Sequence, residues 1–131
     1  MSADASTIEE LLELNRLLLE SIEAGDWETY ARLCDETLTA REPEGVGHLI
    51  EGMAFHRHYF DNRREGPPRN TTIASPHVRL LGDVAVVTYV RLTQSMDEAG
   101  HHTTTPAEET RVWQKQDGVW KHVHFHRSVI G

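Results

Sequence analysis

Cysteine is almost absent from this chain of 131 residues, and so are long hydrophobic runs. Because Cys34 is the single cysteine, no disulfide can form within the chain, which fits a reducing compartment. No apolar run approaches the ~20 residues that span a bilayer, and the N-terminus lacks the basic and apolar regions of a signal peptide. We therefore expect a cytoplasmic domain that does not enter a membrane.

Basic charge is also scarce. Thirteen lysines and arginines stand against 21 aspartates and glutamates, which gives a formal net charge of −8. Arg63-Arg64 is too short to form a basic patch. A chain of this kind is poorly suited to bind nucleic acid or an anionic membrane surface. The length fits one domain with a modest core, and we expect residues 1–6 to be an N-terminal tail and residues 7–131 a single domain.

Helical periodicity dominates the first half of the chain. Ser6 and Glu9 have the spacing of a capping box at the start of a first helix, and Gly25 is a suitable stop. The apolar face of this helix repeats every three or four residues: Ile8, Leu11, Leu12, Leu18, Leu19 and Ile22. The opposite face is acidic, so the segment predicts an amphipathic core helix.

Two further helices are predicted before the periodicity changes from that of a helix to that of a strand. Asp26 is placed to cap a second, short helix. Residues 37–41 look extended, and residues 45–62 carry apolar side chains at the spacing of a third helix. Pro67-Pro68 then breaks the chain and opens a loop.

Strand periodicity follows. Residues 70–80 alternate loosely with a bend at Pro76, residues 84–96 form the strongest strand, and residues 97–105 are a polar hairpin loop. Asp117-Gly118 predicts a tight turn between the last two strands. This order predicts an α+β fold in which helices pack against one side of a curved, mostly antiparallel sheet.

The strand at residues 84–92 is apolar on both faces, and both faces must therefore be covered. The helices can cover one face. The other face, to which alternation also assigns Trp120, predicts contact with a second subunit.

Arginines on candidate core faces are the main functional anomaly. Arg91 shares a face with Tyr89, and Arg127 shares one with Phe125. Arg111 lies two residues from Glu109, which offers a structural ion-pair network without a ligand as one explanation. We prefer a pocket for an anion, because Glu109 alone looks insufficient for three arginines and their forked guanidinium groups suit a carboxylate.

Histidines offer two weaker hypotheses. Alternation places His122, His124 and His126 on one face, where they could chelate a metal, but no further ligand motif accompanies them, so we expect an interface face and no metal or cofactor. His56 could act in acid–base chemistry, together with Tyr30 or Tyr89. Cys34 is expected in the core.

The chain resembles the association (hub) domain of calcium/calmodulin-dependent protein kinase II, within the nuclear-transport-factor-2-like superfamily. The resemblance extends from the first helix to the C-terminus and rests on these segments: Gly25-Asp26-Trp27-Glu28-Thr29-Tyr30, Glu42-Pro43-Glu44-Gly45, His48-Leu49-Ile50-Glu51-Gly52-Met53, Phe55-His56-Arg57, Pro76-His77-Val78, Tyr89-Val90-Arg91-Leu92-Thr93-Gln94, Glu108-Glu109-Thr110-Arg111-Val112-Trp113 and Val123-His124-Phe125-His126-Arg127-Ser128.

The resemblance implies a cone-shaped α+β fold, dimers that assemble into rings, and a deep pocket between sheet and helices. It implies that the pocket binds a small carboxylate or other acidic ligand, and that five residues line it: Arg91, Arg111, Arg127, His56 and Tyr30. Related folds host isomerases, cyclases and dehydratases, so a small-molecule enzyme is the alternative, although no catalytic residue is assigned.

Differences from the family limit which of its properties can be expected of this chain. The sequence contains no kinase domain and no autoregulatory segment. The first helix is acidic, whereas a calmodulin target is typically a basic amphipathic helix, so calmodulin binding is not expected. Arg41 stands where kinase hubs usually have an aromatic residue, and the loop at residues 62–70 is unlike theirs.

Overall fold

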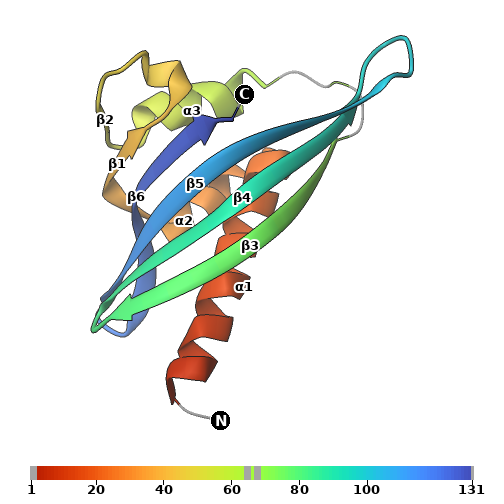
Figure 1. Ribbon diagram of the computed structural model, residues 1–131. Coiled ribbons are helices and arrows are strands. Elements are labelled where there is room, and N and C mark those ends of the chain that lie inside the picture. The colour runs from red at the N-terminus through yellow and green to blue at the C-terminus, as the bar shows by residue number, and fades with distance from the viewer. Residues whose placement is uncertain (1–2, 64–65, 67–68, 131) are drawn as a thin grey trace.

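A computed structural model of the protein describes residues 3–63, 66 and 69–130 (Figure 1). The helices are α1 (Ala3–Ala24), α2 (Trp27–Leu33) and α3 (Ala54–Asp61), and a short 3₁₀ turn is η1 (Pro43–Gly45). The strands are β1 (Cys34–Arg41), β2 (Ile50–Glu51), β3 (Arg69–Leu81), β4 (Val84–Met96), β5 (His102–Gln116) and β6 (Val119–Val129).

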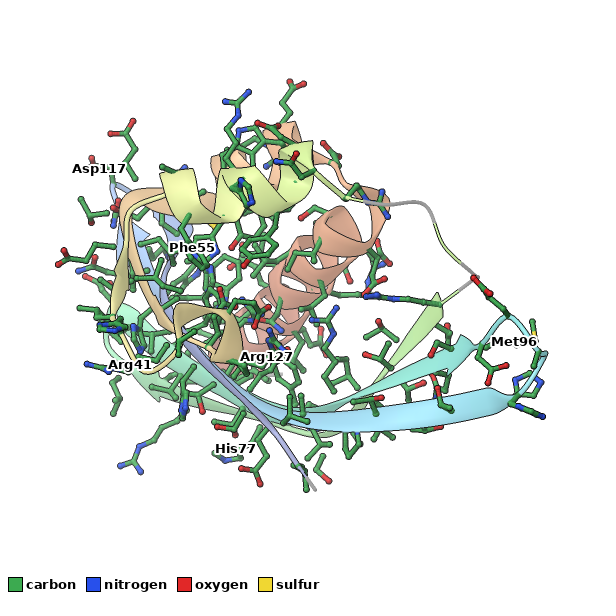
Figure 2. All side chains as sticks on the ribbon, turned by 90° about the horizontal axis from the view of Figure 1, so that it is seen from above. Arg41, Phe55, His77, Met96, Asp117 and Arg127 are labelled. Carbon is green, nitrogen blue, oxygen red and sulfur yellow. The ribbon has the colours of Figure 1, made fainter. Side chains whose placement is uncertain are left out.

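The strands form one sheet in the order β2-β1-β6-β5-β4-β3. Only the β1–β6 pair is parallel among these described strands. Figures 1 and 2 show the helices on the concave side of the curved sheet, with the β4–β5 hairpin around Met96 projecting beyond them. The predicted α+β class, with three helices against a curved and mostly antiparallel sheet, is confirmed.

The first two helices join as predicted at Gly25-Asp26. Gly25 has φ of 68°, which its missing Cβ permits, and the Asp26 amide donates to the Ser21 carbonyl at 2.8 Å. Asp26 then caps α2 by accepting a hydrogen bond from the Thr29 amide at 3.2 Å. The predicted cap at Ser6 is wrong, because α1 begins three residues earlier and Ser6 lies inside it.

The predicted third helix at residues 45–62 is only half correct. Val46, Gly47 and Gly52 have φ values of 50°, 84° and 79°, which a right-handed helix cannot contain. The chain forms η1 and then β2, where Ile50 is buried and pairs with Ala40 of β1. Helix α3 begins only after these turns, at Ala54.

The long strands follow the predicted pattern closely. A register shift between Ala74 and His77 in β3 confirms the bend predicted at Pro76. Asp117 and Gly118 join β5 to β6 with φ of 50° and 82°, a type I′ geometry that matches the twist of the strands. The β4–β5 loop is shorter than predicted because β5 begins at His102. Pro67-Pro68 lies outside the described residues.

A β-bulge in β6 changes the face of several side chains. Val112 pairs with His124 whereas Trp113 pairs with His122, so Val123 is an extra residue on β6. The bulge brings His122 onto the same concave side as Phe125, and both are buried. The prediction that Trp120 lies on the outer face is also wrong, since Trp120 belongs to the core.

The hydrophobic core lies between the concave face of the sheet and helices α1 and α2. Its fully buried members include Leu11 and Leu18 from α1, Val87 from β4 and Trp113 from β5. The Trp113 indole donates to the Asn15 side chain at 3.2 Å, which satisfies both polar groups inside the core. In the described part of the chain, no helix has the length and apolar character needed to cross a membrane.

Candidate functional site

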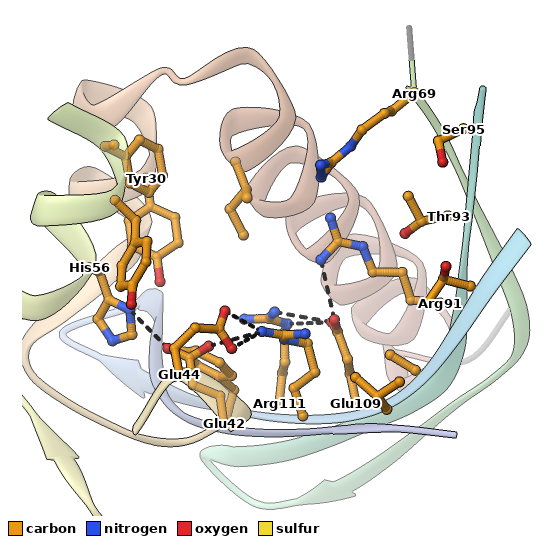
Figure 3. A pocket seen from close by; sticks show the side chains of 18 residues that line it. Tyr30, Glu42, Glu44, His56, Arg69, Arg91, Thr93, Ser95, Glu109 and Arg111 are labelled. Carbon is orange, nitrogen blue, oxygen red and sulfur yellow. Dashed lines mark hydrogen bonds and ion pairs between the residues drawn. The ribbon is translucent and has the colours of Figure 1, made fainter. Parts of the chain in front are cut away.

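A cavity of about 440 Å³ opens on the concave face of the sheet, beside this core. Figure 3 shows Tyr30 and His56 on one side of the cavity, Arg91 on the opposite side, and Arg111 on the floor between them. Arg127 also lines it. The structure thus brings together all five residues that the sequence analysis assigned to the pocket.

The floor of the cavity consists of cross-strand rows on β4, β5 and β6. Arg111 pairs with Phe125, and the next row holds Tyr89, Glu109 and Arg127. The row after that contains Arg91 and its partner Ala107. Since side chains two residues apart share a face, the hairpins project these arginines into one cavity.

Glu109 and Arg111 form the buried centre of the floor. Their residues are 1% and 2% exposed. Arg111 Nη2 donates to Glu109 Oε1 at 3.0 Å, and the Tyr89 hydroxyl donates to the same oxygen at 2.5 Å. Burial alone would raise the pKa of Glu109, but Arg111 and Arg91 outweigh it and lower the pKa to about 2. Glu109 is therefore ionised throughout the neutral range.

Arg111 has further partners that fix its orientation. Its Nε donates to the Tyr89 hydroxyl at 2.8 Å, and its Cζ lies 4.4 Å from the centre of the Phe125 ring. Burial would lower the pKa of Arg111, but Tyr89 and Glu109 outweigh it and raise the pKa. The guanidinium is a permanent cation in the floor, held by one carboxylate and one aromatic face.

Arg91 bridges two carboxylates at the edge of the floor. Its Nη1 donates to Glu109 Oε2 at 3.2 Å, and its Nη2 donates to Glu23 Oε1 at 2.7 Å. Its buried Nε has no hydrogen-bond partner among the described residues. The interaction with Glu23, at the end of α1, was not predicted.

Arg127 is neutralised from η1 and the residue before it. Its guanidinium pairs with Glu44, and Glu42 Oε2 lies 3.8 Å from its Nη2. The sequence suggested only Glu109 to balance three arginines, and the bound anion was inferred from that shortage; in the structure Glu23, Glu42 and Glu44 supply additional negative charge. No strand or helix pattern signalled Glu42 and Glu44, because they lie in irregular backbone.

Glu42 is a lining group whose charge can change near neutral pH. Burial, and next the nearby Glu44 carboxylate, raise the pKa of Glu42 to about 7. Its Oε1 lies 3.7 Å from Nδ1 of His56, beyond a normal hydrogen bond. Near pH 7 the site therefore exists with and without a proton on Glu42.

His56 is a buried, neutral imidazole. Burial, and next the positive Arg111, lower the pKa of His56 to about 4. Its Nε2 has no partner among the described residues. A base with so low a pKa is inefficient near neutrality, so for the enzymatic alternative Glu42 is the better proton acceptor.

Tyr30 completes the helical wall. Burial raises the pKa of the Tyr30 phenol, so its hydroxyl stays protonated and can donate to an acidic ligand. Its ring lies 6.2 Å from the His56 ring and 4.9 Å from the Phe60 ring, between centres. This side of the cavity is aromatic, whereas the floor is charged.

The three alternating histidines do not form a site. His122 points into the core, where its ring stacks on Phe125 and its Nδ1 lies 3.4 Å from Cys34 Sγ. His124 instead contacts the Thr39 hydroxyl at 2.7 Å, and His126 is exposed. No group of metal-binding side chains occurs within residues 3–63, 66 and 69–130. Cys34 is buried, as expected, and burial raises its pKa to about 12.

Comparison with known proteins identifies the relatives of this architecture. The family model described as calcium/calmodulin dependent protein kinase II association domain matches residues 7–131. A calcium/calmodulin-dependent protein kinase type II subunit delta from Oryctolagus cuniculus is 50% identical over 123 residues, which cover 92% of this chain and 23% of the relative. The chain thus spans about a quarter of the length of that curated relative.

Two solved structures extend the comparison. The association domain of the C. elegans kinase is 44% identical, with a TM-score of 0.89 over 95% of this chain and 96% of the other. A nuclear-transport-factor-2-like protein from Salmonella enterica is 20% identical, with a TM-score of 0.79 over 98% of this chain and 94% of the other. The second likeness concerns the fold alone.

Proposed function

Because this chain belongs to the calcium/calmodulin-dependent protein kinase II association domain family, we propose that it is a homo-oligomerisation module, at least a dimer and, in its larger form, a hub-like ring. The module comprises residues 7–131. The unpaired, buried thiol of Cys34 supports a reducing compartment, the cytoplasm.

The outer face of β4 is the observation that carries this proposal. Val84, Val86, Val90 and Leu92 alternate on that face and remain only partly buried within one protomer, although β3 and β5 flank them. All described helices lie on the opposite side of the sheet. A regular apolar strip on an uncovered sheet face is typical of a subunit interface.

A charge in this strip should separate the subunits. Val86→Glu would place an unpaired carboxylate in a desolvated contact, whereas Val119→Glu, next to the exposed Asp117-Gly118 turn, is a matched control. We expect Val86→Glu to lower the mass measured by light scattering and Val119→Glu to leave it unchanged. An unchanged mass for a folded Val86→Glu protein would exclude this face as the interface.

We also propose that the pocket binds a small carboxylate through Arg91, Arg111 and Arg127, with His56 and Tyr30 contributing from the helical side. The supporting observation is that the three arginines, His56 and Tyr30 line one cavity, and that their guanidinium and phenol groups are hydrogen-bond donors suited to a carboxylate.

The charge balance leaves room for such a ligand. Glu44 lies on η1 with its side chain 35% exposed, so it can leave Arg127 for water at little cost. Glu42 can take up a proton near pH 7. Either change frees positive charge in the pocket for a carboxylate.

A thermal-shift screen of small monocarboxylates at constant ionic strength tests this proposal. A ligand present at one hundred times its dissociation constant stabilises the folded state by about 2.7 kcal/mol. Arg127→Gln should abolish the shift, and Arg79→Gln, an exposed arginine on β3, should not. Arg111 is a poor choice for the test, because its removal leaves Glu109 buried without its main partner. Equal shifts for Arg127→Gln and wild type would contradict carboxylate binding.

A further inference from the structure

Beyond the arginine triad (Arg91, Arg111 and Arg127), the pocket continues toward the projecting β4–β5 hairpin. Its lining there includes Arg69, Thr93, Ser95 and Thr105. Thr93 pairs with Thr105, and Arg69 pairs with Ser95, so these residues form the next two cross-strand rows of the floor. Figure 3 shows Arg69 and Arg91 reaching toward the same side of the cavity, next to Thr93 and Ser95.

The hydroxyl groups of this outer end are available to a ligand. Among the described residues, neither the Thr93 nor the Thr105 side chain makes a hydrogen bond, whereas Ser95 shares one of 3.0 Å with Thr103. Thr93 is partly buried within the pocket lining. A free hydroxyl donates readily to a carboxylate oxygen, so the row supplies two donors.

Arg69 adds positive charge at the same end, and Glu23 balances it only in part. Its Nε lies 3.8 Å from Glu23 Oε2, too far for a hydrogen bond, and the other oxygen of Glu23 is engaged by Arg91 at 2.7 Å. Along the line of ion pairs from Arg69 through Arg91 to Arg111, three arginines share two carboxylates, Glu23 and Glu109. The side chain of Arg69 is 57% exposed, so it can turn toward a ligand.

The length of the floor exceeds what a small acid would occupy. Successive rows are two residues apart, which is about 7 Å in an extended strand. The row of Arg127 and Glu109 therefore lies about 13 Å from the row of Thr93 and Thr105 along the sheet. The cavity, at about 440 Å³, is within the range that holds drug-sized molecules.

We propose that the ligand of this pocket is an elongated dicarboxylic acid, whose outer carboxylate binds Arg69 and the hydroxyls of Thr93 and Thr105. This inference rests on the proposed function, because the inner carboxylate binds the arginine triad as described above. The two acidic ends bind cooperatively, since anchoring the first raises the effective concentration of the second at its subsite.

Isothermal titration calorimetry with butyrate, succinate, sebacate and the monomethyl ester of sebacate, at constant ionic strength, tests the outer subsite. Sebacate should bind more tightly than its monomethyl ester, which has the same length and one acidic end. Arg69→Gln should weaken sebacate roughly fivefold, the range of a half-exposed ion pair, and leave butyrate unchanged. Arg79→Gln removes the same charge elsewhere on β3 and should affect neither acid.

The hydroxyls have their own matched variants. Thr93→Val together with Thr105→Val removes two donors while keeping the shape of both side chains, and should weaken sebacate but not butyrate. Thr104→Val, one residue away on the opposite face of β5, should change nothing.

The outcomes separate the two proposals. If butyrate binds but sebacate gains nothing that depends on Arg69, the outer subsite is wrong and carboxylate binding by the triad stands. If none of the acids binds, including butyrate, both proposals are contradicted: carboxylate binding by the arginine triad and the outer subsite.

Discussion

Glu42 is the residue through which pH acts most directly on the pocket. It was not a site candidate in the sequence, where Glu42-Pro43-Glu44-Gly45 was only one of the segments that carry the family resemblance. In the structure it lies beside His56 and Arg127, with its pKa raised to about 7 by burial and by Glu44. Protonation of one carboxyl therefore changes the charge of the site within the neutral range.

The first prediction concerns the stability of this carboxyl. Because the folded pKa of about 7 exceeds the ordinary value of 4.5, the folded state binds the proton more tightly than the unfolded chain. The contribution of Glu42 is complete below pH 4.5 and is lost as the pH rises through 7. Relative to Glu42→Gln, the wild-type free energy of unfolding should fall by roughly 2 kcal/mol between pH 5 and pH 8.

Urea unfolding at both pH values measures this difference, with Glu36→Gln as the control for an exposed carboxylate on β1. Subtracting the variant removes the opposing effect of His56, whose lowered pKa of about 4 makes the fold less stable on acidification below 6.5. A difference between wild type and Glu42→Gln that does not vary with pH would show that Glu42 titrates normally.

At the scale of single elements, the hairpin of β5 and β6 depends on the Asp117-Gly118 turn, which the sequence predicted most clearly. Gly118 has φ of 82°, which a residue with a Cβ adopts only under strain, and there is open space around it. Gly118→Ala should lower the free energy of unfolding by about 1 kcal/mol or more.

Gly66→Ala is the matched control, because a Cβ added at Gly66 would meet no atom of the described residues within 4 Å, and Gly66 is not among the glycines with a left-handed φ. Chemical denaturation of both variants should show a loss only for Gly118→Ala. Equal stability of the two variants would mean that the turn tolerates a side chain.

The helices and strands also show how much of the fold could be predicted from the sequence. Periodicity predicted α1, α2 and the limits of β4, because their apolar side chains recur at the spacing of a helix or a strand. It failed where backbone turns override propensity, as at Gly47 and Gly52, and where one extra residue, Val123, reverses the faces of β6. Strand alternation cannot reveal a bulge in advance, since the extra residue is visible only against its partner strand.

The presence or absence of regular periodicity also explains which residues of the site could be predicted from the sequence. Regular strand positions placed all three arginines of the triad in the pocket correctly, because their strands keep a constant alternation there. Their counterions Glu23, Glu42 and Glu44 come from a helix end and an irregular turn. Such residues meet the strands only through tertiary packing, so the sequence suggested more unbalanced positive charge than the structure contains.

At the scale of the whole molecule, one curved sheet separates the sites of the two proposed functions. The concave side carries the core and the pocket, and the outer side carries the apolar strip of β4. Covering that strip with a second copy would remove the partly exposed valines from water without disturbing the pocket lining. Self-association and ligand binding can therefore be tested independently.

The mass of the purified protein in solution is the most direct test of the proposed association. The chain has a mass of 14.9 kDa. Light scattering coupled to size exclusion at micromolar concentration should give at least twice that value, since a stable interface survives at this concentration. A single species at 14.9 kDa would contradict the account.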